Sequence, residues 1–400
     1  MQFGPRKTGP LVAALLISSM DLATAKSKDE YASESVQAIR ALQSNWYNEN
    51  TGLWHDAWWN SGNALTTLAD FGKLRPGDAV GPNIKRIIQN TFVRAQQASV
   101  YTYKTMGHQG MVSTQSCVNG QGDCFDEHEG LAKRSFPYFL NHYYDDEGWW
   151  ALGLIHAYDY AGNKQYLDAA VRIFQDMQTG EGGPCNGGIY WNKDRQYVNA
   201  IANELYLSVA ASLANRIPAD KAHYTKIAED QWRWFDNSGM ISSQNLINDG
   251  LTSDCSNNGG VTWSYNQGVV LGGLTDLYHA TGNGEYLRRA ATIANAAIGR
   301  LSDSNGVLVE ANRCEFDSSR CGHDGQQFKG IFIRNLRYLH ATAPNDDYKN
   351  FILRNANSIW GKDRDSSNKL GVSWGGPYYG ATGMTQSSAL DALVAAVAVA

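Results

Sequence analysis

Apolar residues recur three and four positions apart through most of the chain, which is the spacing of one face of an α-helix. Few segments alternate apolar and polar residues as strands do. The pattern predicts twelve helices, at residues 31–47, 58–73, 84–100, 147–161, 164–178, 199–215, 219–236, 266–281, 284–301, 328–341, 346–360 and 385–398.

The predicted helices alternate in character along the chain. Every second one, such as 266–281, is rich in Gly, Ala, Leu and aromatic residues on most faces, which is typical of a buried helix. The others, such as 284–301, carry charges on one side. Two near copies, AGNKQYL at 161–167 and TGNGEYL at 281–287, join a buried helix to the next charged one, and their Gly suits a helix end.

Six helical hairpins with a buried inner series favour an all-α fold, the (α/α)6 barrel, in which the inner helices surround a central funnel. An open solenoid of stacked hairpins is the alternative. The longest irregular segments precede inner helices, so we expect them to gather at one rim and to build a site there. They span residues 101–146, 179–198, 237–265, 302–327 and 361–384.

The first 25 residues have the pattern of a secretory signal peptide. Two basic residues, Arg6 and Lys7, precede an apolar run and the small residues of Ala23-Thr24-Ala25. We therefore expect a secreted protein found outside the cell or in the cell wall. Since no linker rich in Pro, Ser or charge interrupts the remainder, residues 26–400 are expected to form a single catalytic domain.

The rest of the chain carries no run of roughly 20 apolar residues, the length a membrane span needs. The apolar end, residues 390–400, is expected to close a core helix, and no Ser/Thr-rich tail suggests a lipid anchor. A net charge of −5 argues against nucleic acid as a partner. We expect a monomer.

Six cysteines in a secreted chain predict three disulfides. Cys117 with Cys124, and Cys314 with Cys321, are each seven residues apart, which leaves Cys185 to pair with Cys255, although fifteen pairings are possible. The cysteines lack the CxxC or Cys/His spacing of a zinc site, and no nucleotide-binding motif occurs. The sequence therefore predicts neither a metal nor a cofactor.

Two adjacent carboxylates, Asp145 and Asp146, stand among four aromatic residues at the start of a predicted inner helix. Either could be a helix N-cap, since Asp is favoured there, but capping accounts for one Asp only. Two carboxylates held close repel, so that one keeps its proton while the other stays ionised. Glycoside cleavage uses that division of labour, which makes both residues candidate catalytic groups.

Aromatic and amide residues recur at or just before the other inner-helix entrances. Sugars stack their C–H faces on rings and offer hydroxyls to neutral polar groups, so the recurrence suggests a sugar-binding funnel, although such aromatics also serve as core. The motifs lie at 58–60, 187–191, 263–268, 328–330 and 374–380. The candidate substrate-binding residues are Trp58, Trp59, Asn60, Tyr144, Trp191, Asn199, Asn203, Tyr265, Gln267 and Lys329.

Three charged residues inside predicted inner helices could each have a functional or a structural role. Glu204 is either a third acid of the site or a paired acid of the core, and the second is favoured. Lys329 and Arg334 either bind a substrate hydroxyl or neutralise acids of the barrel in plain salt bridges.

Taken together, these motifs resemble glycoside hydrolase family 76, the α-1,6-mannanases and their fungal cell-wall relatives. The matching pieces are Tyr144-Asp145-Asp146 with Gly148-Trp149-Trp150, Trp58-Trp59-Asn60, the segment 187–191, the segment 199–204 and Tyr265-Asn266-Gln267-Gly268. The resemblance implies an (α/α)6 barrel and a retaining mechanism, with Asp145 as the nucleophile and Asp146 as the acid/base.

The first expectation is thus a secreted hydrolase that cleaves α-1,6-mannosidic bonds of mannan, endo-acting and retaining. A cell-wall transglycosidase acting on mannan-bearing glycolipid anchors is the second reading, which differs only in the acceptor that resolves the covalent intermediate. A mannan-binding lectin without turnover is the third, and the intact Asp145-Asp146 pair argues against it.

Overall fold

The computed structural model describes residues 26–106, 112–118, 121–122, 137–316 and 321–400, together with Met1 and Gly4. The predicted signal peptide, residues 1–25, lies outside the described residues apart from Met1 and Gly4, and it stays a prediction.

The twelve predicted helices are all present in the described part of the chain. They are α1 (Lys28–Trp46), α2 (Trp58–Leu74), α3 (Ile84–Ala95), α4 (Tyr144–Ala161), α5 (Lys164–Met177), α6 (Ala200–Ala214), α7 (Lys221–Asn237), α8 (Ser264–Thr281), α9 (Glu285–Arg300), α10 (Phe328–Thr342), α11 (Asp346–Lys362) and α12 (Gly383–Val399). Two helix boundaries differ from the predicted ones in ways that bear on the site. Helix α3 ends five residues before the predicted end, and α4 begins at Tyr144, so that it includes Asp145 and Asp146.

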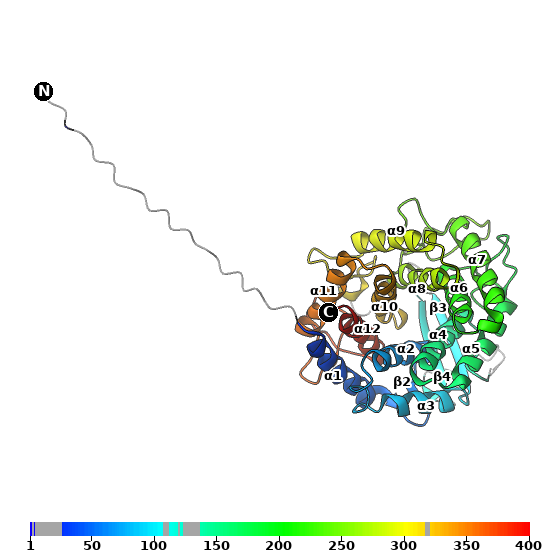
Figure 1. Ribbon diagram of the computed structural model, residues 1–400, viewed down its shortest axis with the longest axis horizontal. Coiled ribbons are helices and arrows are strands. Elements are labelled where there is room, and N and C mark those ends of the chain that lie inside the picture. Colours follow the sequence, from blue (N-terminus) through cyan, green and yellow to red (C-terminus); the bar gives the residue numbers. More distant parts are fainter. Residues whose placement is uncertain (2–3, 5–25, 107–111, 119–120, 123–136, 317–320) are drawn as a thin grey trace.

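The even-numbered helices form a closed inner ring (Figure 1). Each packs against the next along the chain, from α2 through α4, α6, α8 and α10 to α12, and α12 packs back against α2. The odd-numbered helices surround this ring (Figure 1). The contact between α12 and α2 excludes the open solenoid, and the predicted (α/α)6 barrel is confirmed.

Burial distinguishes the two rings as the sequence predicted. Every residue of α6 is buried, because its flanks contact two inner neighbours as well as an outer helix. In α9 the buried residues are Tyr286, Ala290, Ile293, Ala294 and Ala297, which lie on one helical face. The outer helices therefore need only one apolar stripe.

Two glycines allow inner helices to approach closely. A Cβ added at Gly268 of α8 would lie 2.6 Å from the Cα of Phe332 on α10. A Cβ at Gly330 of α10 would clash with the backbone of Ser388 on α12. Because any side chain at either position would collide with backbone, these residues set the spacing of that part of the ring.

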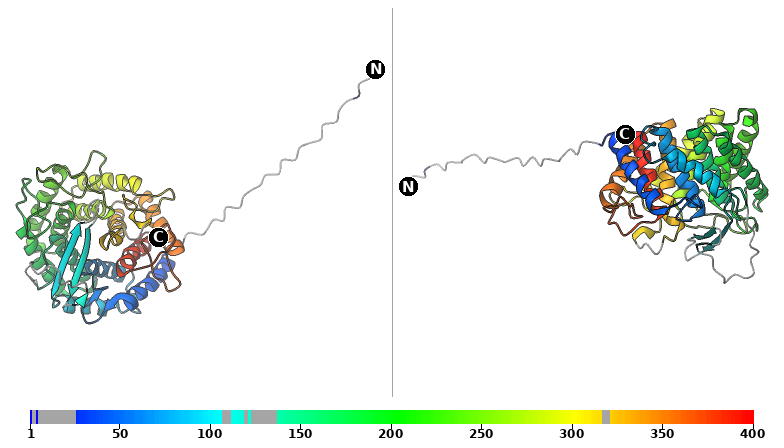
Figure 2. Two further views of the ribbon diagram at one scale, coloured as in Figure 1. Left: turned by 180° about the vertical axis from the view of Figure 1, so that it is seen from behind. Right: turned by 90° about the horizontal axis from the view of Figure 1, so that it is seen from below.

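A β-hairpin lies across one end of the ring, in a segment that the sequence reading treated as irregular. Strand β3 (Val100–Met106) pairs antiparallel with β4 (Val112–Val118), with Lys104 opposite Thr114, and β4 also pairs with β5 (Gln121–Gly122). A second, two-stranded pair joins β1 (Tyr47–Asn48) to β2 (Leu53–Trp54). Figure 2 shows the long hairpin over the opening of the ring. The β-branched and aromatic residues of β3 were the available signal for a strand.

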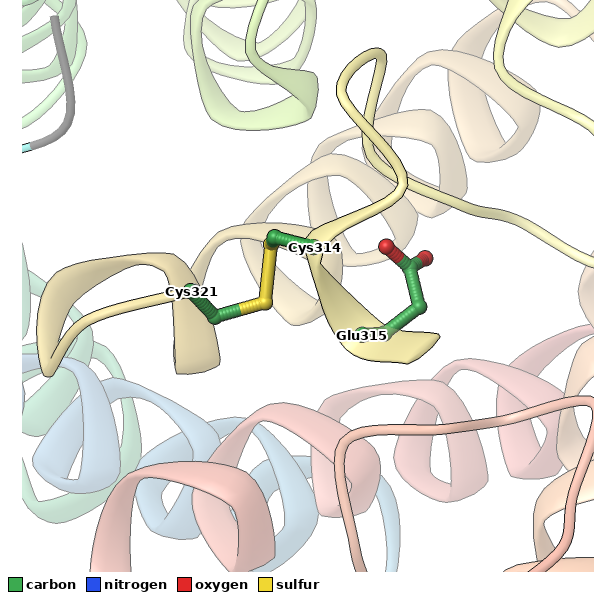
Figure 3. A group of neighbouring side chains, drawn as sticks. All are labelled: Cys314, Glu315 and Cys321. Atoms are coloured by element: carbon green, nitrogen blue, oxygen red, sulfur yellow. A yellow bond between two sulfur atoms is a disulfide. The ribbon is translucent and has the colours of Figure 1, made fainter. Parts of the chain in front are cut away.

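Two of the three predicted disulfides are confirmed. Cys185 is bonded to Cys255, and Cys314 to Cys321 (Figure 3). Cys124 lies outside the described residues, so its pairing with Cys117 stays a prediction. Glu315 lies beside the Cys314–Cys321 bond, but the paired sulfurs leave Glu315 without thiolate partners for a metal.

None of the described helices is both long enough and apolar enough to cross a membrane.

A buried ion pair joins α10 to α12 inside the ring. Arg334 lies 3.0 Å from Asp391, and Thr67 of α2 donates a hydrogen bond of 2.6 Å to the same carboxylate. The side chains of Arg334 and Asp391 are 5% and 2% exposed. The contact with Asp391 confirms the prediction that Arg334 forms a salt bridge. Together with Thr67, the pair connects α2, α10 and α12 where the ring closes.

Replacing Arg334 with Met is expected to lower the free energy of unfolding by about 3–5 kcal/mol, because it leaves the Asp391 carboxylate buried without a cation. The double variant Arg334→Met/Asp391→Leu should regain most of this loss, since neither charge is then buried. Urea denaturation measures both. Lys226→Met, which breaks the exposed Lys226–Asp230 pair, is the control and should change stability by less than about 1 kcal/mol. Equal losses in the single and double Arg334 variants would contradict this account.

Glu204 is an acid of the core, but it is not paired. The residue is fully buried in α6, and neither carboxyl oxygen has a hydrogen-bond partner among the described residues. Burial raises the pKa of Glu204 well above its ordinary value, and the nearby Asp249 carboxylate adds to the effect. The fold therefore favours the protonated form of this side chain.

The stability of the wild type is expected to fall relative to Glu204→Gln as the pH rises above about 4.3, the ordinary pKa of Glu. The folded state then holds a proton that the unfolded state releases, and each pH unit costs about 1.4 kcal/mol until Glu204 ionises in the fold. Urea denaturation at several pH values measures this difference. The exposed Glu285→Gln is the matched control, and parallel profiles for wild type and Glu204→Gln would refute the assignment.

Candidate active site

A cavity lies where the amino-terminal ends of five inner helices meet, beneath the β3–β4 hairpin. Its wall combines three carboxylates, one lysine and a set of aromatic rings. The lining residues are Trp59, Lys104, Val112, Asp145, Trp149, Trp191, Tyr197, Asn199, Ile201, Asp249, Trp263, Tyr265, Asp324 and Phe328.

The first turn of α4 carries both candidate catalytic residues. The N-cap of α4 is Tyr143, and no side chain caps the helix there, so the reading of Asp145 or Asp146 as an N-cap is wrong. Because successive residues on a helix point about 100° apart, the acids of this turn separate. Asp145 lines the cavity, whereas Glu147 points to Lys193, 2.8 Å away.

Lys104 of β3 binds both aspartates. Its ammonium nitrogen Nζ lies 2.9 Å from Asp145 Oδ2 and 2.7 Å from Asp146 Oδ1. The second oxygen of Asp146 accepts a hydrogen bond of 2.6 Å from Asn141. The second oxygen of Asp145 is buried and has no partner in the described structure. Asp145 therefore presents one free carboxyl oxygen, while both oxygens of Asp146 are occupied.

The environment of Asp146 favours its protonated form at mildly acidic pH. Complete burial raises its pKa, the Lys104 ammonium lowers it, and the Asp145 carboxylate raises it again, with a result of about 7. Burial alone would lower the pKa of Lys104, but the carboxylates of Asp145 and Asp146 raise it above its ordinary value. The cluster therefore holds a charged lysine beside a carboxyl group that exchanges its proton near neutral pH.

Two further acids face the cavity, Asp249 from the loop before α8 and Asp324 from the segment before α10. Asp249 accepts a hydrogen bond of 2.7 Å from the Tyr197 hydroxyl, and burial raises its pKa to about 6. Asp324 accepts hydrogen bonds from Trp59 Nε1 at 3.0 Å and from Thr114 at 2.8 Å. Burial raises the pKa of Asp324 as well.

Aromatic rings form the remaining walls. Tyr265 stacks on Phe328 with ring centroids 3.8 Å apart and planes within 8°. Trp59 stacks on Trp149 at 5.6 Å. Flat apolar faces alternating with carboxylates are suited to a pyranose ring, whose C–H face stacks while its hydroxyls donate hydrogen bonds.

Four of the predicted substrate-binding residues lie in the cavity wall: Trp59, Trp191, Asn199 and Tyr265. Asn199 is also the N-cap of α6, since its side chain accepts a hydrogen bond from the backbone N–H of Ala202 at 3.3 Å.

The two predicted amides Asn203 and Gln267 lie outside the cavity wall and have the same structural task. Asn203 binds the backbone N–H and C=O of Ile189, at 2.8 Å and 3.0 Å. Gln267 binds the N–H and C=O of Ile247, each at 2.9 Å. Each amide thus fastens a rim loop to an inner helix, and its contact with substrate stays a prediction.

The other four predicted residues are also outside the cavity wall. Trp58 packs against Trp150 in the core, and the Tyr144 hydroxyl pairs with Thr179. Lys329 donates to the carbonyl of Val372 at 2.6 Å and lies 3.4 Å from Glu315, which favours its salt-bridge reading. Asn60 is buried, and its amide nitrogen has no partner among the described residues.

Sequence reasoning missed Lys104, Asp249 and Asp324, all of which lie on loops or on the hairpin. Their signal was weak, because an isolated charge in a long irregular segment is usually a solvated residue. Trp263 and Phe328 belong to the aromatic motifs 263–268 and 328–330, but the predicted substrate-binding residues there are their neighbours. The aromatic motifs therefore predict which helix entrances line the cavity, but not always which residue does.

Curated relatives share moderate identity with this chain. The mannan endo-1,6-alpha-mannosidase DFG5 of Candida albicans is 25% identical over 303 residues, which cover 72% of this chain and 59% of the relative. A putative mannan endo-1,6-alpha-mannosidase of Schizosaccharomyces pombe is 29% identical over 215 residues, covering 50% of this chain and 48% of the relative. The matches thus span about half to three fifths of these relatives.

Solved structures share the fold at lower identity. Dfg5 from Chaetomium thermophilum, in complex with glucosamine, superposes with a TM-score of 0.73 at 18% identity, covering 94% of this chain and 92% of that one. An inactive variant of the α-1,6-mannanase GH76A of Salegentibacter, with two consecutive Asp changed to Asn and α-1,6-mannotriose bound, gives 0.72 at 19% identity, covering 92% and 100%.

Residues 26–399 match glycosyl hydrolase family 76. The match takes in every helix of the barrel and each described residue of the cavity wall. The chain belongs to glycosyl hydrolase family 76.

Proposed function

We propose that this protein is a secreted glycoside hydrolase that cleaves α-1,6-mannosidic bonds within mannan and retains the anomeric configuration. The observation that carries the proposal is the Asp145–Asp146 pair in the first turn of α4: Asp145 lines an aromatic-walled cavity, and the fully buried Asp146, which is not among the lining residues, shares its lysine. Family membership supplies the reaction class, and the relatives named above suggest the linkage.

The geometry of the pair suits a retaining mechanism. Lys104 binds one oxygen of each aspartate, at 2.9 Å and 2.7 Å, so these two oxygens can be no further apart than the sum of those distances. Retaining enzymes keep their carboxyl groups about 5–5.5 Å apart, whereas inverting enzymes separate them by about 6.5–9.5 Å to admit a water. This upper limit supports the retaining assignment.

In the first step Asp145 is the nucleophile. Its free oxygen Oδ1 bonds to the anomeric carbon while the bond from that carbon to the glycosidic oxygen breaks. Asp146, protonated below a pKa of about 7, gives its proton to the departing oxygen, a step in which its carboxyl group exchanges one of its contacts with Lys104 and Asn141 for the substrate. The products are a mannosyl ester on Asp145, a shortened sugar and an ionised Asp146.

In the second step Asp146 acts as the base. It takes a proton from water, whose oxygen bonds to the anomeric carbon and displaces Asp145. A sugar hydroxyl in place of water would give a transglycosidase, the second candidate function. A lectin would need the cavity but not the pair of carboxylates.

The crystal structures of relatives give independent support. The Salegentibacter mannanase was made inactive by changing two consecutive Asp residues, and it binds α-1,6-mannotriose. This chain has two such pairs, and only Asp145–Asp146 contributes to the cavity, because Asp346–Asp347 opens the outer helix α11. We further propose that the protein acts as a monomer outside the cell or in the cell wall.

Asp145→Asn is expected to abolish the release of reducing ends from unbranched α-1,6-mannan, with a loss on the order of 10⁴-fold or more, because the nucleophile is gone. Asp146→Asn should lose about 10²–10⁴-fold on mannan. With an aryl mannoside whose leaving group needs no proton, Asp146→Asn should still release the aryl group in a first burst, whereas Asp145→Asn should not.

The double variant Asp346→Asn/Asp347→Asn is the matched control and should keep full turnover. Calorimetry with α-1,6-mannotriose should show that Asp145→Asn still binds sugar. Near-native turnover by Asp145→Asn or Asp146→Asn would show that the pair is not catalytic and would favour the lectin.

Hydrolysis and transfer can be separated by their products. With excess α-1,6-mannobiose as acceptor, we expect shortened mannan chains to predominate over lengthened ones, because water resolves the ester on Asp145. Mass spectrometry of the products at early times measures the ratio. A majority of lengthened oligosaccharides would favour the transglycosidase.

A further inference from the structure

Three side chains on the inner face of the β3–β4 hairpin connect it to the site: Lys104 and Thr114 contact acids directly, and Thr102 contacts Asn141. Thr102 and Lys104 are two positions apart on β3 and therefore point to the same face, and Thr114 stands opposite Lys104 on β4. Thr102 accepts a hydrogen bond of 3.2 Å from Asn141, the residue that also binds Asp146. Thr114 donates to Asp324. The hairpin is thus attached to the site by contacts on both sides of Lys104.

Lys104 is the only lysine or arginine in the cavity wall that the described residues form. Its side chain is 2% exposed. The charged groups that face it are Asp145 and Asp146 on α4 and Asp324 before α10. Its ammonium lies 4.5 Å from the ring centre of Tyr143 and 5.3 Å from that of Trp191. Aromatic faces attract a cation, so the rings hold the ammonium against the carboxylates.

We propose that Lys104 is a positioning residue of the reaction proposed above: it binds Asp145 and Asp146 together and supplies the positive charge that lets the pair carry one proton and one negative charge. The part of this inference that concerns catalysis rests on the proposed function. The part that concerns the charge of the pair rests only on the contacts of Lys104. Nothing in the local sequence around the aspartates provides this cation, since Lys104 is 41 residues before Asp145.

Charge balance gives the physical argument. Two buried carboxylates without a cation would both tend to keep their protons, because desolvation disfavours each ionised form. A protonated Asp145 cannot attack the anomeric carbon. Lys104 balances the charge of one ionised and one protonated carboxyl group in the pair, which is the state that the first chemical step requires. Asp324, the third acid that faces Lys104, is hydrogen-bonded to Trp59 and Thr114 instead.

An ordinary structural ion pair would not be arranged in this way. A single carboxylate would suffice to neutralise Lys104, yet its Nζ binds two, and one of these, Asp145, lines the cavity. Lys104 holds Oδ2 of Asp145, and the buried Oδ1 has no hydrogen-bond partner in the described structure.

The test compares Lys104→Met, Lys104→Arg and Thr105→Val in the full chain, with kcat and kcat/KM on α-1,6-mannan measured as a function of pH. Lys104→Met should lose about 10²-fold or more in kcat, and both limbs of its pH profile should move upward by about one unit or more, because an adjacent cation lowers carboxyl pKa values by that amount. Lys104→Arg should keep the position of the profile.

Thr105→Val is the matched control, because Thr105 follows Lys104 on the same strand, points to the other face and is exposed. It should leave both rate and profile unchanged. A Lys104→Met variant that loses activity equally at every pH, or that gains activity, would overturn the proposal. Thermal melting of each variant distinguishes a lost charge from a lost fold, and Lys104→Arg provides the rescue.

A second measurement separates this inference from the proposed function. Infrared titration of the carboxyl groups, with Asp146→Asn to assign the band, follows the Asp146 proton without any substrate. If the wild type does not cleave mannan but the band still titrates at higher pH in Lys104→Met, the proposed function fails and the role of Lys104 in the pair stands. An unchanged band would overturn the role of Lys104, whatever the activity.

Discussion

The packing of α12 against α2 is the contact on which the rest of the architecture depends. Each inner helix is apolar on most faces, so it is stable only with neighbours on both flanks and an outer helix behind. Closing the ring gives all six inner helices a neighbour on both flanks. An open array would leave one flank of each terminal inner helix exposed to water. The same closure brings helix amino-terminal ends to one rim, where five of them contribute to a single cavity.

This convergence explains why acids collect at the cavity. Helix amino-terminal ends carry partial positive charge and unpaired N–H groups, which stabilise nearby carboxylates. Burial acts in the opposite direction and raises the pKa of Asp146 to about 7 and that of Asp249 to about 6. The site therefore holds carboxyl groups that exchange protons close to neutral pH, a property that general acid/base chemistry uses.

The rim loops and the hairpin add what the barrel itself lacks. Asn203 and Gln267 each hold the backbone of one loop residue with both ends of an amide, so the loops are fixed to the inner ring. The β3–β4 hairpin brings the lysine to the paired aspartates. Two solved structures share the barrel with this chain at 19% and 18% identity, so the fold is kept although most residues differ.

The sequence alone determined the twelve helices, their division into two rings and the position of the acidic pair, because helical periodicity and burial are local properties of the pattern. It could not decide which neighbour in a motif faces the cavity. Tyr265 lines the wall while Gln267 does not, because residues two positions apart on a helix point about 200° away from each other. Which of the two faces the cavity depends on the rotation of α8, and packing sets that rotation.

Nor could the sequence place Lys104 beside Asp145 and Asp146. A lysine in a long loop is ordinarily solvated, and its role follows only from the fold of a hairpin across the closed ring. Tertiary structure therefore decided which cation faces the pair, since that depends on distances between residues far apart in the chain.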